Sequence, residues 1–468
     1  MPSASVSPPA WLSAWMSASA ALFYLLMLTA FSGYSLGAAL LLFGGLAVWL
    51  TDRRGPKHAD AGVGAAMAPW SREDRTLCWL LLAVFVVNAA AVVWHGDEGK
   101  YLDQGSRYLL AIPIVYGLRR VSLRLSWIVA ALALGTSGAG AIAWWQVGHL
   151  ALDRPSGFVT SAIPFGDIAL TMGFWCLMAA AEAAIRGRRV WAVLLLLSGL
   201  AGEYAVIASA TRGSLLALPV MAVLGGIALF RRRHLRPLLA GGAAVLVMLV
   251  IIFSVLPVGK IADSRYTGAF TEWQEYSRLG EVANNTVGPR LEAWKAAFVS
   301  IPERPILGWG HLQYDAHLRD LIAVGRVNPF VDTLSNTHNN FLEIWLHQGT
   351  LGLVAILALL ISSFWSFARR LRSPDLLLRV LACCGASLPA SFATFGLTQV
   401  ILGRNNGVMF FLVSLAVLWA AIRERETTYI GSGGVGRWQK QPVTDGAVVI
   451  NNAEVTLRSL DEHTSCAC

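Results

Sequence analysis

The sequence predicts an all-α polytopic membrane protein with about 12 transmembrane helices and one large helical loop. Hydrophobic residues make up 56% of the 468 residues and charged residues only 14%, whereas a soluble chain of this length needs more polar surface. Several apolar runs reach the roughly 20 residues that a helix needs to cross a hydrocarbon core. Alternating strand patterns of the barrel type are absent from the sequence. The spans are therefore expected to be helices, which satisfy their own backbone hydrogen bonds in lipid.

The predicted spans fall on both sides of one long polar stretch. Those before it are 11–30, 34–50, 77–94, 108–118, 127–147, 165–185, 190–208, 213–230 and 237–256, and those after it are 341–367, 376–397 and 408–422. The span 108–118 is short, but removing it would place the arginines that follow it on the other side and invert everything downstream. The predicted parts are transmembrane helices 1–9 (1–256), the helical loop (257–340), transmembrane helices 10–12 (341–423) and a flexible cytoplasmic tail (424–468).

Arginines set the predicted orientation. They cluster in alternate short connections, which the positive-inside rule assigns to the cytoplasm. The clusters include Arg119–Arg120, Arg186–Arg189, Arg231–Arg233 and Arg369–Arg372. Both termini are then inside, and the loop 257–340 is outside. The net charge of +9 is explained by this placement and by contact with membrane lipids. No basic domain with interleaved aromatic residues indicates nucleic-acid binding.

The long loop is expected to fold into a small helical cap. Apolar residues recur at helical spacing in 289–300 and again in 311–324. The apolar faces of these two helices would rest on the membrane domain or on the lipid surface.

His338 is the candidate general base. It stands in the polar stretch 335–341, where the outer loop re-enters the membrane. An imidazole with a pKa near ~6.5 suits proton transfer at neutral pH and is worth about 10²–10⁴-fold in rate. The alternative is a histidine that caps or hydrogen-bonds the start of a helix. Asn339 and Asn340 are candidates for substrate binding, although both are also ordinary N-cap residue types.

No metal centre is expected. The loop histidines His311 and His317 share no zinc-ligand spacing with His338, and no carboxylate pair joins them. The outer segments also lack an Asp-x-Asp motif that would hold a divalent cation for a diphosphate. The sequence therefore favours a metal-independent site without a cofactor.

Arg212 is the first candidate for binding an anion. It lies between two apolar runs, and an ionisable residue at a helix break near bilayer depth normally has a partner or a function. Its guanidinium suits phosphate oxygens, and backbone amides at the start of the next span could add to the site. The alternative is snorkelling to the interface or an ion pair with Glu203.

Further arginines are expected on the same face. Arg290 opens the first loop helix, and its alternative is a solvated helix face. Arg265 lies in the same loop, whereas Arg154 and Arg107 fall at outer span boundaries. Together these side chains would give an outward-facing cavity the positive charge that suits a pyrophosphate.

Four stretches carry a family resemblance through their order and topology. They are Arg154-Pro-Ser-Gly157 with Phe165-Gly166, Ser209-Ala-Thr-Arg-Gly213, Arg290-x-x-x-Trp294 through Pro305-x-x-Gly308-x-Gly310, and Thr337-His-Asn-Asn-Phe341 with Gly349-x-x-Gly352. In this arrangement the chain resembles the O-antigen ligase and polymerase superfamily of bacterial envelope enzymes. The four stretches span roughly 154–352, and the helix count extends the resemblance to most of the chain.

The resemblance implies a GT-C-like glycosyltransferase that acts on the periplasmic face of the bacterial inner membrane. Ligases of this superfamily transfer a glycan from undecaprenyl diphosphate to a sugar hydroxyl of lipid A–core, without metal or ATP and with inversion at the anomeric carbon. By motif, His338 matches the loop histidine that acts as the base. Arg212 and Arg290 match the arginines on the diphosphate, where they would stabilise the charge of the leaving group.

Other functions remain as alternatives. The single dominant loop that ends in the histidine favours a ligase, whereas a polymerase extends the glycan itself and a protein O-oligosaccharyltransferase modifies pilin-type proteins. A transporter would have inverted repeats and ionisable residues deep in broken helices, but the sequence has no clear repeat and its charges cluster toward one face. A binding scaffold for envelope assembly would tolerate the loss of every candidate residue.

Overall fold

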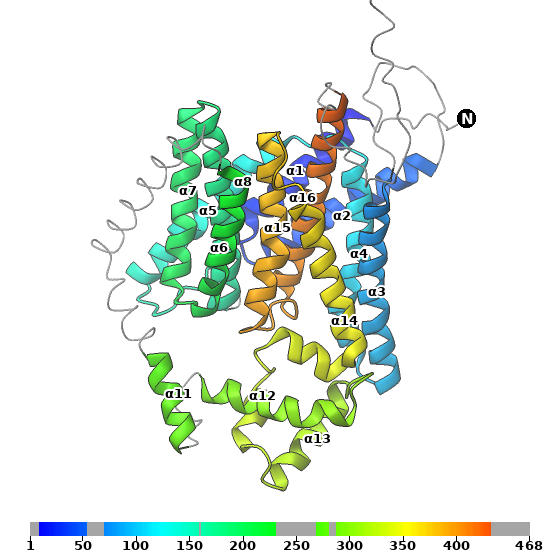
Figure 1. The fold of residues 1–468 in the computed structure, drawn as a ribbon, viewed down its shortest axis with the longest axis vertical. Coiled ribbons are helices and arrows are strands. Elements are labelled where there is room, and N and C mark those ends of the chain that lie inside the picture. The colour runs from blue at the N-terminus through cyan, green and yellow to red at the C-terminus, as the bar shows by residue number, and fades with distance from the viewer. Residues whose placement is uncertain (1–8, 54–69, 159–160, 231–267, 280–286, 432–468) are drawn as a thin grey trace, which may run out of the picture. The chain divides into compact units, whose positions relative to one another are not determined.

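The computed structural model describes residues 9–53, 70–158, 161–230, 268–279 and 287–431. The chain divides into two units, Met1–Thr427 and Thr428–Cys468, and the described residues lie in the first unit except for 428–431. Its described residues form helices and turns, with no β-strand among them. In Figure 1 most of the long helices run alongside one another, and α12 and α13 lie at one end of them.

The helices that precede the long loop are α1 (Ala10–Leu26), α2 (Gly33–Arg53), α3 (Arg72–His95), α4 (Leu102–Arg119), α5 (Leu125–Gly148), α6 (Ala162–Ile185), α7 (Arg189–Ala208), the 3-10 helix η2 (Arg212–Ala217) and α8 (Leu218–Leu229). The loop contains α11 (Gly268–Leu279), α12 (Gly288–Ser300), α13 (His311–Ala323) and the short 3-10 helix η5 (Pro329–Thr333). The last helices are α14 (Asn340–Ala368), α15 (Leu376–Gly396) and α16 (Asn405–Gly431).

The membrane class is confirmed. Nine helices of the described residues are long and apolar enough to cross a membrane. Every predicted span coincides with a helix except 237–256, which lies outside the described residues. The short fourth span is part of α4, a helix of 18 residues. The count of 12 and the position of the loop outside the membrane remain predictions.

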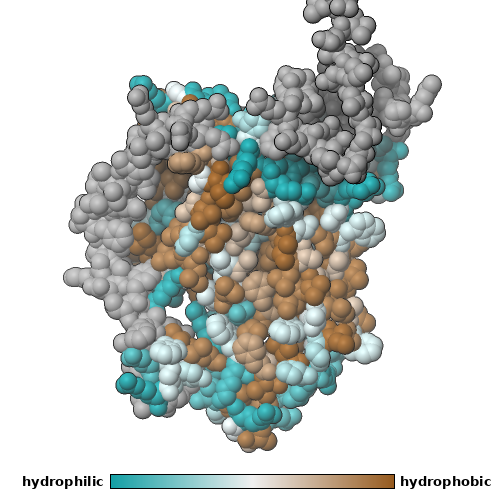
Figure 2. All heavy atoms as spheres, in the orientation of Figure 1, coloured by the Kyte–Doolittle hydropathy of each residue, from teal (hydrophilic) through white to brown (hydrophobic). Residues whose placement is uncertain are grey.

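Large apolar side chains cover the outer faces of the helices. Phe43 is 64% exposed, Trp79 69% and Val93 77%. Figure 2 shows hydrophobic residues over the middle of the visible face and hydrophilic residues toward its two ends. A continuous apolar surface is unfavourable in water and normal in lipid, which agrees with a chain embedded in a membrane.

The centre of the helices is formed by α6, α15 and α16, which are the most buried of the apolar spans. Trp175 on α6 donates from Nε1 to Ser387 Oγ on α15 at 2.9 Å. The ring of Trp175 stacks on Phe410 of α16, with 5.6 Å between the ring centroids. Pairing of this kind is needed because an indole N–H without a partner is costly in an apolar core.

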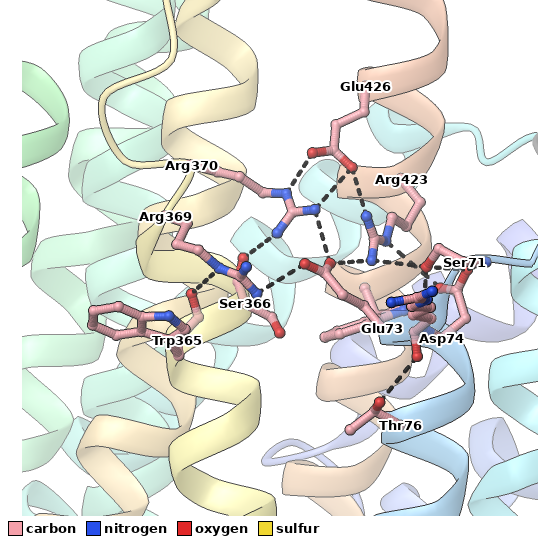
Figure 3. Close-up of polar contacts among 12 residues, drawn as sticks. Ser71, Glu73, Asp74, Thr76, Trp365, Ser366, Arg369, Arg370, Arg423 and Glu426 are labelled. Carbon is pink, nitrogen blue, oxygen red and sulfur yellow. Dashed lines mark hydrogen bonds and ion pairs between the residues drawn. The ribbon is translucent and has the colours of Figure 1, made fainter. Parts of the chain in front are cut away.

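One end of the helices holds a network of acids and arginines (Figure 3). Glu73 at the start of α3 accepts from Arg370, which follows α14, at 2.9 Å and also from Arg423 on α16. The adjacent Asp74 binds Arg119 of α4 at 3.1 Å. These arginines belong to the connections that the sequence assigns to the cytoplasm, and acids of neighbouring helices balance their charges.

The opposite end carries the cap, which we define as residues 287–337. The predicted loop helices 289–300 and 311–324 coincide with α12 and α13, whereas α11 was not expected. Glu292 of α12 accepts from the backbone N–H of Asn328 at 3.2 Å. This bond joins α12 to the connection that leads to η5.

The cap crosses α14 at a break in that helix. The break is at Gly349, where φ is 66° and ψ is −166°. The backbone N–H of Trp309 donates to Leu346 O at 2.8 Å, so the cap satisfies a carbonyl that the break leaves free. A Cβ on Gly308 would lie 2.6 Å from the Gly349 nitrogen. Only glycine permits this close approach, which fixes the cap on α14.

The cap is also bound to the end of α3. The Asp97 carboxylate accepts from the backbone N–H groups of His311 and Leu312 at 2.9 and 3.0 Å, so it caps α13 from a different part of the chain. The His311 ring stacks between Tyr101 and His347, with ring centroids 3.7 and 4.0 Å apart. Burial lowers the pKa of His311 to about 4, so this stack carries a neutral imidazole at pH 7.

Candidate active site

His338 lies on the turn that joins the cap to α14, with a φ of 53° that is rare outside glycine. On the cap side, Trp294 Nε1 donates to Thr337 O at 2.9 Å. On the helix side, Thr337 N–H donates to Glu343 Oε2 at 2.8 Å. His338 N–H itself donates to Asn336 Oδ1 at 3.0 Å. These bonds hold a strained backbone in place, as is common at functional sites.

Asn339 and Asn340 bind backbone groups. The Oδ1 of Asn339 caps α14 by accepting from Leu342 N–H at 3.1 Å, and its Nδ2 donates to Leu397 O at 3.3 Å. The Oδ1 of Asn340 accepts from Leu402 N–H at 3.1 Å. These contacts agree with the capping alternative and hold the connection after α15 against the His338 turn. Substrate binding by the two amides remains a prediction.

The same connection positions the His338 ring. The ring Nδ1 lies 3.2 Å from Gln399 Oε1, and Oε1 also accepts from Val400 N–H at 3.2 Å. A backbone N–H can only donate, so the Gln399 atom that bonds to Val400 N–H must be the side-chain oxygen. The same oxygen faces Nδ1 of His338. Nδ1 therefore carries the proton, and Nε2 has the free lone pair that a general base needs.

The charge state of His338 favours the same role. Burial lowers the pKa of His338 below its ordinary value of 6.5, and the positive charges of Arg290 and Arg404 lower it further. The hydrogen bond with Gln399 and the carboxylate of Glu343 act in the opposite direction. Because the pKa lies below 6.5, the imidazole is mostly neutral at pH 7.

Arg290 and Arg212 lie close enough for their charges to interact. Burial is the main cause that lowers the pKa of Arg290, and the charge of Arg212 is the second. Arg290 stands in the first turn of α12, and Arg212 opens η2. The charge of Arg290 also acts on His338, so Arg290 lies within range of charge interaction with both other candidate residues. Their catalytic roles remain predictions.

These two arginines differ from those at the opposite end of the helices. Within the described part of the chain, neither Arg212 nor Arg290 forms an ion pair, and the alternative pair of Arg212 with Glu203 is not found. The charge of Glu272 acts on Arg290 and opposes the lowering of its pKa. Two neighbouring guanidiniums without an ion pair favour the binding of an anion, and the planar guanidinium suits phosphate oxygens.

The turn before Arg212 is held by side-chain hydroxyls. Ser209 Oγ lies 2.7 Å from Thr211 Oγ1, and Thr211 Oγ1 donates to Ala162 O at 3.2 Å. Arg154 donates from Nε to Ser209 O at 3.1 Å. Arg154 therefore supports the turn that presents Arg212, and its predicted contact with the substrate is not tested.

The remaining candidates lie elsewhere or outside the described residues. Arg107 pairs with Asp103 of the preceding turn of α4 and donates to Asn405 Oδ1 at 2.7 Å, so it ties α4 to the start of α16. Arg265 is outside the described residues. His317 stacks on Trp309, with 3.9 Å between the ring centroids. No group of three or more metal-ligand side chains is placed to hold a metal ion in the part of the chain that the structure describes.

The structure adds three residues to the candidate site predicted from the sequence: Gln399, Arg404 and Glu343. Gln399 and His338 are 61 positions apart, and nothing in the sequence around Gln399 indicates the contact. Arg404 stands in a short outer turn between two predicted spans, so its position on the same face as His338 could have been inferred. Glu343 lies one turn into the span that follows His338, where it reads as an ordinary helix residue.

The fold and site define a helical membrane protein with a polar site where a cap meets the ends of the helices. Residues 191–357 match the family model described as O-Antigen ligase. That stretch contains α7, η2, the cap and the first part of α14, and therefore Arg212, Arg290 and His338. The match supports a member of the O-antigen ligase superfamily, and with it a glycosyltransferase-like class of membrane enzyme. An uncharacterized protein of Haemophilus influenzae is 22% identical over 348 residues, which are 74% of this chain and 86% of that protein.

Proposed function

We propose that the chain is an O-antigen ligase of the bacterial inner membrane. It transfers a glycan from undecaprenyl diphosphate to a sugar hydroxyl of lipid A–core on the periplasmic face, with inversion at the anomeric carbon and without metal or cofactor. The observation that supports the proposal is the contact of His338 Nδ1 with Gln399 Oε1 at 3.2 Å, together with the charge of Arg290, which acts on His338, and that of Arg212, which acts on Arg290.

The proposed reaction is a single displacement. The Nε2 lone pair of His338 takes the proton from the acceptor hydroxyl as its oxygen attacks the anomeric carbon of the donor sugar. The bond between that carbon and the diphosphate oxygen breaks, and the electron pair leaves with the diphosphate. The acceptor and the leaving group occupy opposite sides of the carbon, which accounts for inversion.

Arg212 and Arg290 would bind the diphosphate. Charge accumulates on the leaving oxygen in the transition state, so cations placed there accelerate the reaction more than they tighten ground-state binding. The charge of Arg290 also lowers the pKa of His338. An anion bound to Arg290 would weaken this effect, so the bound donor itself would make His338 a stronger base.

A purified enzyme assay tests the proposal. The protein is incubated with undecaprenyl diphosphate-linked glycan and lipid A–core in the presence of EDTA, and the products are separated by size. We expect a higher-molecular-weight lipopolysaccharide product. Product with lipid A–core supports a ligase, whereas elongation of the lipid-linked glycan alone supports the polymerase alternative. A requirement for added metal would contradict the metal-independent mechanism.

The His338→Ala variant tests the base. It should insert into the membrane normally and lose transfer. A lipopolysaccharide ladder of near-normal intensity from cells with this variant as their sole copy would reject the role of His338 and leave the superfamily assignment unaffected.

A further inference from the structure

A cavity of about 820 Å³ lies between α3, α4, α13 and the first half of α14. Ser335, Asn336 and Thr337, the residues directly before His338, form part of its wall. His338 and the arginines Arg212 and Arg290 do not line it. The cavity is therefore a neighbour of the candidate active site rather than a part of it, and the His338 turn runs along its edge.

The charges in the cavity are of both signs. Its lining includes the acidic residues Asp315, Asp332 and Glu343 and the basic residues Arg319 and Arg404. A diphosphate would meet three carboxylates there, which disfavours binding of an anion. A neutral ligand with many hydroxyls would find both acceptors and donors, because each hydroxyl can donate to a carboxylate and accept from a guanidinium.

The uncharged polar residues of the lining also suit a neutral ligand with many hydroxyls. Tyr101 and Tyr314 contribute aromatic rings, and Asn88 and Gln104 contribute amides that both donate and accept. Aromatic rings offer a flat apolar surface with a polar tip, which matches a sugar ring with apolar C–H faces and hydroxyls around its edge. The volume lies in the upper part of the range for pockets that bind small molecules.

The other part of the lining is apolar. Val84 of α3 and Ile344, Ala355 and Ile356 of α14 line it, and both helices are long and apolar enough to cross a membrane. A ligand that fills the cavity therefore meets both polar and apolar walls. A glycolipid has this chemistry.

We propose that this cavity binds the sugar head group of the acceptor glycolipid and delivers its hydroxyl to His338. The inference rests on the proposed function, since it assigns a site to the second substrate of the same reaction. Arg404 links the two compartments because it lines the cavity and its charge acts on His338. The donor diphosphate on the arginines and the acceptor in the cavity reach His338 from separate compartments, which suits an in-line displacement.

Ser335→Trp tests the inference by filling the cavity. Ser335 is an exposed wall residue whose hydroxyl accepts a hydrogen bond from the Asn336 side-chain amide at 3.0 Å. Thr333→Trp is the matched control, since Thr333 is also exposed but does not line the cavity. In Ser335→Trp we expect the KM for lipid A–core to rise at least tenfold while the KM for the lipid-linked donor is unchanged. Thr333→Trp should change neither constant.

Asp332→Asn is a second, nearly isosteric variant that keeps the wall intact. It should raise the KM for lipid A–core without altering the thermal unfolding midpoint in detergent. An unchanged acceptor KM in a folded Ser335→Trp protein, or a rise in the donor KM instead, would overturn the cavity inference and leave the proposed function standing.

A binding measurement separates the two proposals if the wild type transfers no glycan. The water-soluble core oligosaccharide, released from lipid A, is titrated into the wild type and both tryptophan variants by calorimetry. Binding that is lost in Ser335→Trp and kept in Thr333→Trp supports the cavity as a sugar site even though the ligase proposal fails. Equal binding by all three proteins, or no binding by the wild type, overturns the inference.

Discussion

The φ of 53° at His338 allows its catalytic role to be separated from a structural one. A residue other than glycine pays of order 1–3 kcal/mol for such a conformation, so glycine relieves strain while it removes the imidazole. We predict that His338→Gly keeps or raises the thermal unfolding midpoint in detergent and lowers transfer about 10²–10⁴-fold.

Ala151→Gly is the control for this prediction. Ala151 has a φ of 49° on an exposed connection, so the glycine variant should gain stability without a change in transfer. If His338→Gly unfolds, the imidazole is a structural element of the turn. If it transfers glycan at the wild-type rate, His338 is not the base.

The hydrogen bond with Gln399 raises the pKa of His338 against the effect of burial, and this predicts a change in the pH profile when Gln399 is replaced. If His338 is the base, transfer requires its neutral form, and the rate should rise with pH through the pKa of His338, which lies below 6.5. Gln399→Glu places a carboxylate beside Nδ1, stabilises the protonated ring and should move the acidic limb to higher pH.

Gln399→Met removes the hydrogen bond that raises the pKa of His338, so the limb should move to lower pH while the maximal rate falls. The measurement is kcat/KM for transfer between about pH 5 and 8. If the acidic limbs of the pH profiles coincide in the wild type and in both Gln399 variants, Gln399 is only a packing residue.

The candidate residues differ in how far the sequence could reveal them. His338 and Arg212 are visible because polar or charged residues at the ends of apolar runs are costly unless they have a function. The contact of Gln399 with His338 is not visible, because it depends on how the end of α15 meets the start of α14. Asn339 shows the opposite case, since its residue type and position predict the helix cap that the structure contains.

At the scale of elements, the crossing of Gly308 and Gly349 fixes the cap on α14. Gly308→Ala would place a Cβ 2.6 Å from the Gly349 nitrogen at a φ of 73°, whereas Gly325→Ala has a φ of 70° and open space. Both variants pay about 1–2 kcal/mol for the left-handed conformation. We predict that Gly308→Ala pays a further ~1–3 kcal/mol for the clash.

Thermal unfolding midpoints in detergent test this difference. Gly308→Ala should have the lower midpoint of the two alanine variants and should also lose transfer, because the displaced cap carries Trp294 and the His338 turn. Equal midpoints would mean that the cap does not depend on this crossing.

Helices were the predictable part of the fold, because lipid imposes a constraint that acts along the sequence: each span must be apolar and of sufficient length. The break in α14 was not predicted, although Gly349 belongs to a motif that the sequence contains. It arises from the close approach of the cap, which is a tertiary contact. The helix α11 was also missed, although Phe270, Trp273 and Tyr276 recur at intervals of three residues in the sequence.

At the scale of the whole first unit, the two sets of connections gather at opposite ends of the helices. At the cap end, Arg107 bonds to Asn405 and Asn340 bonds to Leu402. At the other end, Glu73 binds Arg370. This pattern agrees with the alternation of connections that the arginine clusters predict. The arginines around Glu73 are paired with acids of neighbouring helices, and binding of a substrate by Arg212 and Arg290 remains a proposal.

Asp74→Asn should therefore destabilise the protein without changing its chemistry. Asp74 is fully buried and binds Arg119, which is 6% exposed, and it also accepts from Trp419 Nε1 at 2.7 Å. Without the carboxylate, Arg119 remains buried without its counter-charge, which costs about 3–5 kcal/mol. We expect a lower unfolding midpoint in detergent and a kcat per folded molecule close to that of the wild type.

Glu98→Gln is the control for Asp74→Asn. Glu98 pairs with Lys100 at side-chain exposures of 55% and 61%, so its replacement should leave the midpoint unchanged. Equal midpoints for the two variants would contradict a stabilising role for the arginine network.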